Sequence, residues 1–172
     1  MQGRNYREPR GMPYIRREYI GGKPQLKIAK FRGGATGDYD FKIELIANTK
    51  VQVLHNALEA ARLGGNKVMA AEVGDTAFSS LLRVYPHVIL RENKMIATAG
   101  ADRLQEGMRR SFGKPWTLGA RIRRGQVIYE LQVKANDLKT AKRAMRTASS
   151  KLPVTTSINI IPLKEEVAKL LK

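Results

Sequence analysis

Apolar and polar residues alternate in several short stretches of the chain, and such alternation predicts β-strands with one buried face. Residues 41–47, FKIELIA, show the pattern over their whole length. Two of the stretches are separated only by a short turn at Arg124-Gly125, so they are expected to form a hairpin. The predicted strands are residues 41–47, 78–84, 87–90, 118–123, 127–133 and 154–161.

Two other stretches place apolar residues at helical spacing. Thr49 and Gln52 fit a capping box, so a helix is predicted to begin there and to end at Gly64-Gly65. A second helix is predicted to begin at Asn136 or Asp137 and to stop before Pro153. Its inner stripe consists of Leu138, Ala141, Ala144, Met145 and Ala148. A short helix over 162–171 is predicted after the last strand.

The order of these elements predicts an α+β fold: a mixed, mainly antiparallel sheet with two packed helices, an extended basic N-terminal arm and a long central loop. Residues 1–36 are predicted to be the arm, because Pro and Gly interrupt any helix or long strand there. Residues 37–172 are predicted to form a single α+β domain that contains the loop 101–114.

Positive charge is concentrated outside the globular middle of the chain. The 172 residues include 32 Lys and Arg against 15 Asp and Glu, a net charge of +17. Residues 1–36 hold nine cations against two carboxylates, whereas residues 37–100 hold seven of each. Residues 101–126 again hold seven cations against two carboxylates. Acidic residues would serve solubility better, so this distribution favours a polyanionic partner, above all a nucleic acid.

Composition and motifs argue against several classes of protein. The absence of Cys excludes disulfide scaffolds and thiolate metal sites, and two histidines make a multi-His metal site improbable. No phosphate-binding P-loop is complete, because Met108 and Pro115 stand where Gly and Ser or Thr are needed. We therefore expect no enzyme, no cofactor and no metal site. His55 is expected to be a partly buried structural imidazole, and Asp38 and Asp40 to be solvated carboxylates.

Nothing in the sequence indicates a membrane protein. The chain has no apolar run long enough to span a bilayer, and its first residues lack the apolar stretch of a signal peptide. A soluble, intracellular protein is the expectation.

Aromatic rings alternate with the basic residues of the arm; they are Tyr6, Tyr14, Tyr19 and Phe31. Rings among guanidinium groups suit stacking on bases and clamping of phosphates. The same rings could instead pin the arm to the core of the protein, and the sequence leaves both interpretations open.

The segment 100–115 is long, basic and interrupted by glycine. Loops of more than about 12 residues in compact domains are usually functional or disordered. The basic side chains of this segment favour a function in phosphate binding.

Four blocks in and around this loop are distinctive: Asn93-Lys94-Met95, Ala99-Gly100-Ala101-Asp102-Arg103-Leu104-Gln105, Gly107-Met108-Arg109 and Phe112-Gly113-Lys114-Pro115. They closely resemble the large-subunit ribosomal protein family L-ten-e, the archaeal and eukaryotic counterpart of bacterial L-sixteen. The likeness continues into the N-terminal segment, at Pro13-Tyr14 and Arg16-Arg17-Glu18-Tyr19, and covers nearly the whole chain. The absence of cysteine fits an archaeal-type member.

The resemblance implies an α/β fold bound to large-subunit rRNA, with the loop reaching toward the peptidyl-transferase centre and the acceptor ends of A- and P-site tRNA. The candidate loop contacts are Arg103, Gln105, Arg109, Arg110 and Lys114. The candidate rRNA contacts are Arg4, Arg7, Arg10, Arg16, Arg17, Lys23, Lys27, Lys30, Arg32, Arg121, Arg123 and Arg124. The implied partners are rRNA, tRNA and neighbouring ribosomal proteins, with the chain a monomer in the cytoplasmic ribosome.

Three rival functions share parts of this pattern. A free-standing RNA-binding or ribosome-assembly factor would have the same composition. An RNA-modifying enzyme would need a catalytic cluster that the sequence lacks. A membrane-surface role would use the basic outer side of the second helix, whose Ala-rich inner side is needed for the sheet.

Overall fold

Strand β2 (Phe41–Ala47) is an inner strand of the larger, five-stranded sheet. The computed structural model describes residues 8–94 and 107–164. On one side β2 pairs with β7 (Val127–Val133), and on the other with β8 (Thr156–Pro162). Strand β4 (Ser79–Leu82) continues the sheet beyond β7, and β1 (Arg32–Gly34) forms its edge. All these pairs are antiparallel.

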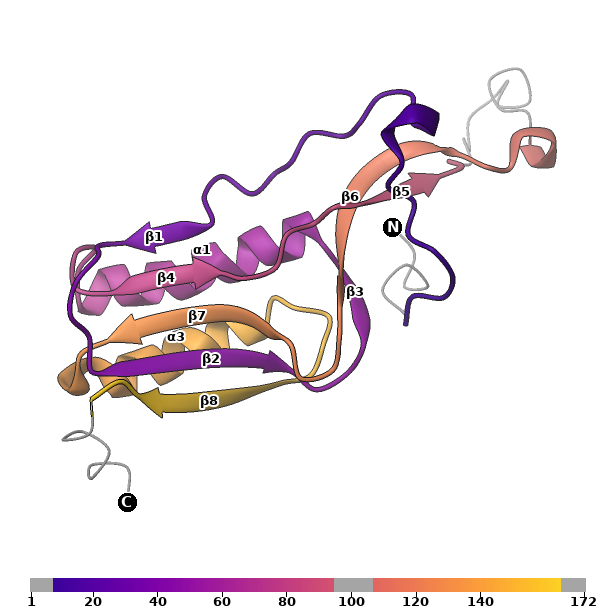
Figure 1. Cartoon of the computed structure of the whole chain (residues 1–172). Coiled ribbons are helices and arrows are strands. Elements are labelled where there is room, and N and C mark those ends of the chain that lie inside the picture. Colours follow the sequence, from indigo (N-terminus) through magenta and orange to yellow (C-terminus); the bar gives the residue numbers. More distant parts are fainter. Residues whose placement is uncertain (1–7, 95–106, 165–172) are drawn as a thin grey trace.

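Two helices cover one side of this sheet (Figure 1). They are α1 (His55–Glu72) and α3 (Leu138–Ser149), and they pack against each other. The inner stripe predicted for the second helix is confirmed, since Ala141, Ala144, Met145 and Ala148 are buried. They meet a core that includes Phe41, Ile43, Leu45 and Leu131. Burying such side chains contributes roughly 1.5–3 kcal/mol each relative to exposure.

A second, three-stranded sheet extends away from the helices (Figure 1). Its central strand β6 (Lys114–Ile122) pairs with β3 (Val51–Leu54) and with β5 (Val88–Glu92), both antiparallel. Short 3₁₀ helices occur at η2 (Arg17–Tyr19), η3 (Gly107–Arg110) and η4 (Ala135–Asp137). The predicted α+β class, with mainly antiparallel pairing and two packed helices, is confirmed, but its strands form two sheets.

Two predictions about the first helix are wrong. The residues read as its first turn form β3, where Val51, Val53 and Leu54 are all buried against β6 and the core. The helix also continues through Gly64-Gly65 to Glu72. Gly65 lies against Tyr129, where a larger residue would crowd the ring, so Gly65 serves close packing and the pair does not end the helix.

The predicted hairpin over 118–133 is also wrong. Both strands exist, but β6 belongs to the small sheet and β7 to the large one. The turn between them is held by the larger sheet, because Gly125 N donates to Ala47 O at 2.7 Å and Ala47 N donates to Gln126 O at 3.0 Å. The turn therefore carries the chain from one sheet to the other. The helix predicted over 162–171 lies mostly outside the described residues.

Candidate nucleic-acid interface

The long central connection leaves the body at the far end of the small sheet (Figure 1). The last pair of β5 and β6 is Glu92 with Lys114. Beyond it, Asn93 Nδ2 donates to Gly107 O at 3.3 Å, which ties the start of η3 to the end of β5. Arg109, Lys114 and the 84%-exposed Met108 project from this end. The described part of the predicted loop thus stands away from the core, held by β-strand pairing.

The arm lies along the surface of its own domain. Ile28 is buried in the main core, and Leu82 N donates to Phe31 O at 2.8 Å beside β1. Nearer the N-terminus, Ile89 N donates to Tyr14 O at 3.0 Å, so the arm joins the free edge of β5. Of the two interpretations of the arm's rings, pinning to the core is confirmed for Phe31, which packs against the core and stacks on Tyr85, whereas Tyr14 contacts Phe112, an exposed residue of the loop base. Tyr19 remains 68% exposed.

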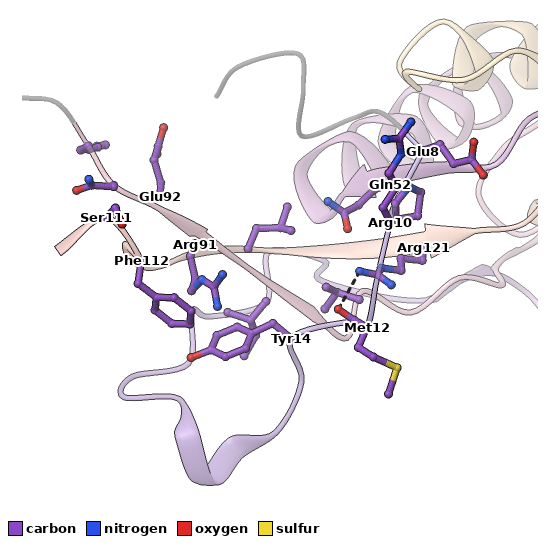
Figure 2. Close-up of a pocket in the computed structure, with 16 residues that line it drawn as sticks. Glu8, Arg10, Met12, Tyr14, Gln52, Arg91, Glu92, Ser111, Phe112 and Arg121 are labelled. Carbon is purple, nitrogen blue, oxygen red and sulfur yellow. Dashed lines mark hydrogen bonds between the residues drawn. The ribbon is translucent and has the colours of Figure 1, made fainter. Parts of the chain in front are cut away.

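Arg121, a predicted rRNA contact on β6, holds the arm. Its Nη1 donates to Gly11 O at 2.7 Å. Its Nη2 donates to Met12 O at 3.4 Å, and Figure 2 shows this second bond. Two donors in the planar fork of one guanidinium fix the arm's backbone in place. The Arg121 side chain therefore has a structural role within the protein itself.

A groove of about 730 Å³ lies between the arm and the small sheet. Figure 2 shows Arg91 at its centre, against the rings of Phe112 and Tyr14. The Arg91 guanidinium carbon is 3.4 Å from the Phe112 ring centroid and 4.4 Å from that of Tyr14. Arg10 and Arg121 line the same groove, together with Glu8 and Glu92. No motif or spacing in the sequence distinguishes Arg91 from the other basic residues.

A second cation–aromatic contact lies at the same end of the small sheet. Lys94 Nζ is 3.7 Å from the ring centroid of Trp116, which is half-exposed. Trp116 is the single tryptophan of the chain. Its place on β6, between the exposed Lys114 and the buried Thr117, was not predicted from the sequence. The signal that could have indicated it is a Trp that directly follows the basic segment ending at Lys114-Pro115.

Several cations of the body pair with carboxylates, whereas the exposed cations of the arm and loop base, like Lys139 and Arg146 on α3, have no carboxylate partner among the described residues. Lys42 and Arg83 both contact Glu130, at 3.3 and 2.7 Å, and Arg62 contacts Glu59 at 2.6 Å. Arg143 contacts Glu72. Within residues 8–94 and 107–164, no carboxylate pairs with the exposed side chains of Arg10, Arg16, Lys23, Lys27, Lys30, Arg32, Arg109, Lys114, Arg123 and Arg124.

Not every candidate residue can be placed. Arg17 lies in η2 and Arg110 in η3. Arg4, Arg7, Arg103 and Gln105 lie outside the described residues. The placed cations occur in two groups, one along the arm and one at the loop base, while Arg123 and Arg124 stand at the turn between the sheets.

Asp38 and Asp40 both form ion pairs with Lys164. Lys164 Nζ lies 2.8 Å from Asp38 Oδ2 and 3.0 Å from Asp40 Oδ1. Asp40 also accepts a hydrogen bond from Ala135 N at 3.0 Å. These contacts hold the pKa of Asp40 below its usual value, with the Lys164 hydrogen bond the larger cause. The pair ties the chain after β8 to the start of β2; the Asp38 carboxylate remains 82% exposed, as predicted, whereas that of Asp40 is only 22% exposed.

His55 is a buried structural imidazole, as the sequence predicted. Its Nδ1 accepts from Lys27 N at 3.4 Å, so its Nε2 carries the proton and donates to Thr117 Oγ1 at 3.1 Å. Burial lowers the pKa of His55, and the nearby charge of Lys27 lowers it further. The neutral ring joins the arm, α1 and β6.

No helix in the described part of the chain combines the length and apolarity needed to cross a membrane.

An α+β body with unpaired cations on an extended arm and at the end of a projecting strand pair is typical of a nucleic-acid-binding protein. Residues 9–159 match the family model described as Ribosomal protein L16p/L10e, and the chain belongs to this family. The resemblance seen in the sequence is thereby confirmed.

Relatives with the printed name "Large ribosomal subunit protein uL16" are similar over most of their length. The relative from Hyperthermus butylicus is 52% identical over 157 residues, which cover 91% of this chain and 87% of the relative. The relative from Metallosphaera sedula is 52% identical over 167 residues, which cover 95% of each chain. The relative from Saccharolobus solfataricus is 49% identical over 165 residues, 94% of this chain and 93% of the relative.

Proposed function

We propose that this protein is a structural constituent of the large ribosomal subunit that binds rRNA and performs no covalent chemistry. The names of its relatives support this role. The finer proposal is that residues 1–36 form an rRNA-binding arm on the α+β domain 37–172. Its loop, 101–114, lies near the peptidyl-transferase centre and the tRNA acceptor ends. The partners are rRNA, A- and P-site tRNA and neighbouring ribosomal proteins, with one copy in each ribosome.

The observation that carries the proposal is the set of exposed, unpaired cations along the arm and at the loop base. Lys42, Arg62 and Arg83 are held in ion pairs, whereas the arm and loop base present cations without a carboxylate partner among the described residues. Phosphate groups of RNA supply the missing anions, and arginine can donate two hydrogen bonds to one phosphate. Roughly 6–10 such contacts would lower the affinity by about 10³–10⁵ between 50 and 200 mM salt.

Sedimentation of the protein with ribosomal particles tests the structural role. Quantitative mass spectrometry across a sucrose gradient of cell lysate, at moderate and at high salt, should find one copy in each mature large subunit. Sedimentation near the top, or with immature particles alone, would instead identify a free RNA-binding or assembly factor.

Charge removal at the loop base tests the finer proposal. Arg109→Ala with Arg110→Ala should leave subunit assembly intact and slow peptide synthesis, because the loop would lose its contacts to RNA near the tRNA ends. The matched control is Lys139→Ala with Arg146→Ala on the exposed side of α3, which removes the same charge. Equal translation rates in fully assembled subunits of both variants would refute the loop's role.

A further inference from the structure

The arm and the loop base meet at one point on the small sheet. Tyr14 O accepts from Ile89 N at 3.0 Å, and Arg121 fixes the arm two and three residues earlier. Tyr14 Oη donates to Tyr19 O at 3.0 Å, which closes the arm around η2. The Tyr14 ring is therefore held by backbone contacts on both of its sides.

Arg91 joins this ring to Phe112. The two rings are 5.9 Å apart with planes at 86°, an edge-to-face pair, and the Arg91 guanidinium lies near both. Arg91 is on β5 opposite Pro115 of β6, so its backbone belongs to the strand pair that carries the loop. The Arg91 side chain thus contacts one residue of the arm, Tyr14, and one residue of the loop, Phe112.

Phe112 lies between η3 and Gly113, so its contacts help to set the position of η3. It follows Arg110 by two residues and precedes Gly113, whose φ of +77° turns the chain into β6. A Cβ at Gly113 would lie 2.8 Å from Asn93 N, so the turn fits tightly on the end of β5. Because the backbone is fixed on one side of Phe112, the ring contact fixes the other side, where Arg109 and Arg110 are.

We propose that Arg91 is a positioning residue that couples the arm to η3. Through Tyr14 and Phe112 it sets the place of Arg109 and Arg110 relative to the cations of the arm. The coupling matters for the proposed function, on which this inference rests: RNA bound by the arm holds η3 in its orientation, and RNA at η3 in turn strengthens the arm's hold. Such reciprocity is required of any two coupled binding sites.

Hydrogen exchange on the free full-length protein tests the coupling without RNA. Tyr14→Ala, in the arm, should speed amide exchange across 107–112 by roughly two- to thirtyfold, the range expected for losing cation–π contacts. Phe112→Ala should do the same for residues 10–14. Tyr14→Phe keeps the ring and should restore slow exchange in 107–112, while amides of β2 and β7 stay protected in all variants. Unchanged exchange in 107–112 with Tyr14→Ala would overturn the proposal.

Binding of large-subunit rRNA separates this proposal from the proposed function. RNA should slow exchange at residues 107–112 in the unaltered protein and in Tyr14→Phe, and less so in Arg91→Lys, whose ammonium lacks the planar face. Protection that is equal in Arg91→Lys would refute coupling while leaving RNA binding in place. A failure of the unaltered protein to bind rRNA would refute the proposed function, and the exchange result on the free protein would still stand.

Discussion

Two adjacent glycines in α1 have different surroundings. A Cβ at Gly64 would meet Thr147 Cγ2 of α3 at 3.5 Å, an ordinary contact. A Cβ at Gly65 would lie 3.2 Å from Tyr129 Cε1 and 3.4 Å from its Oη. Tyr129 is fully buried, and its hydroxyl donates to Asn66 Oδ1 at 2.7 Å, so the ring has little freedom to withdraw. Burial also raises the pKa of Tyr129 to about 12, which keeps the hydroxyl a donor.

Gly64→Ala should therefore stabilise the protein, whereas Gly65→Ala should destabilise it. Both substitutions gain up to about 1 kcal/mol of helix propensity. The second also overpacks the site beside Tyr129, at a cost of roughly 1–3 kcal/mol. Urea denaturation of the two variants measures the difference, and equal free energies of unfolding would show that Tyr129 moves aside freely.

His55 makes the stability of the fold depend on pH. Its folded-state pKa is lowered, mainly by burial, so between that value and about 6.5 the unfolded chain binds a proton that the folded protein does not. The free energy of unfolding should fall as the pH drops below about 6.5. Asp40 and Glu59, whose pKa values are also lowered, add a separate loss below about pH 4.

Chemical denaturation at a series of pH values checks this expectation, with His87→Gln as the control because the His87 side chain is exposed. The decline below pH 6.5 should persist in the control. It should disappear in His55→Gln, whose overall stability is lower because the bonds to Lys27 and Thr117 are disturbed. A decline that survives His55→Gln would have to come from another group.

At the scale of elements, the local pattern of apolar and polar residues was enough to predict most strands, but not which strands pair with each other. The stretch 41–47 was predicted to the residue, because its alternation reflects one core face. Residues 51–54 were assigned to a helix because Thr49 and Gln52 fit a capping box and Val51 and Leu54 fit a helical stripe, and a four-residue stretch is too short for its alternation to decide. The hairpin failed because the turn at Gly125 bonds to Ala47, a partner remote in sequence.

Some residues of the candidate site could be predicted from the sequence, whereas others could not. Arg109 and Lys114 were identified from charge and resemblance, and the structure places both at the exposed loop base. The structural use of Arg121 and the contacts of Arg91 depend on which arm residue reaches which strand. No spacing along the chain carries that information.

The turn between η3 and β6 gives an element-scale prediction. Gly113→Ala should displace the loop base, because it combines a positive φ with a Cβ only 2.8 Å from backbone atoms. Trp116, three residues later, should report the shift through its emission. Gly125→Ala is the matched control, since its φ is +80° but nothing lies within 4 Å. Emission that is unchanged in Gly113→Ala would contradict the tight fit of the turn.

At the scale of the whole molecule, charge and core occupy separate regions. The helices and the larger sheet hold most of the ion pairs and the buried side chains. The arm and the far end of the small sheet hold exposed cations without a carboxylate partner among the described residues, and that end of the small sheet lies away from the helices (Figure 1). Substitutions there should alter binding to RNA with little effect on folding.

The salt dependence of rRNA binding should show which of the exposed cations contact phosphate. Each phosphate contact that is removed should reduce the slope of log K against log salt by roughly 0.9 or less. Lys27→Gln, Lys30→Gln and Arg32→Gln together should reduce it by about two to three, with the melting temperature nearly unchanged. Lys139→Gln with Arg146→Gln on α3 should leave the slope close to its original value; an equal reduction would indicate that net charge alone governs binding.

The position of β2 inside the larger sheet also dictates when the protein can fold. Its two neighbours, β7 and β8, are made more than 80 and more than 100 residues later. While a ribosome is synthesising the chain, β2 has no neighbour in the sheet until β7 has been made, and its pairing with β8 is complete only once residue 162 has been added. Distant pairing of this kind slows folding and leaves apolar strands open to aggregation. The nascent chain is therefore most prone to aggregation just before β8 has been synthesised.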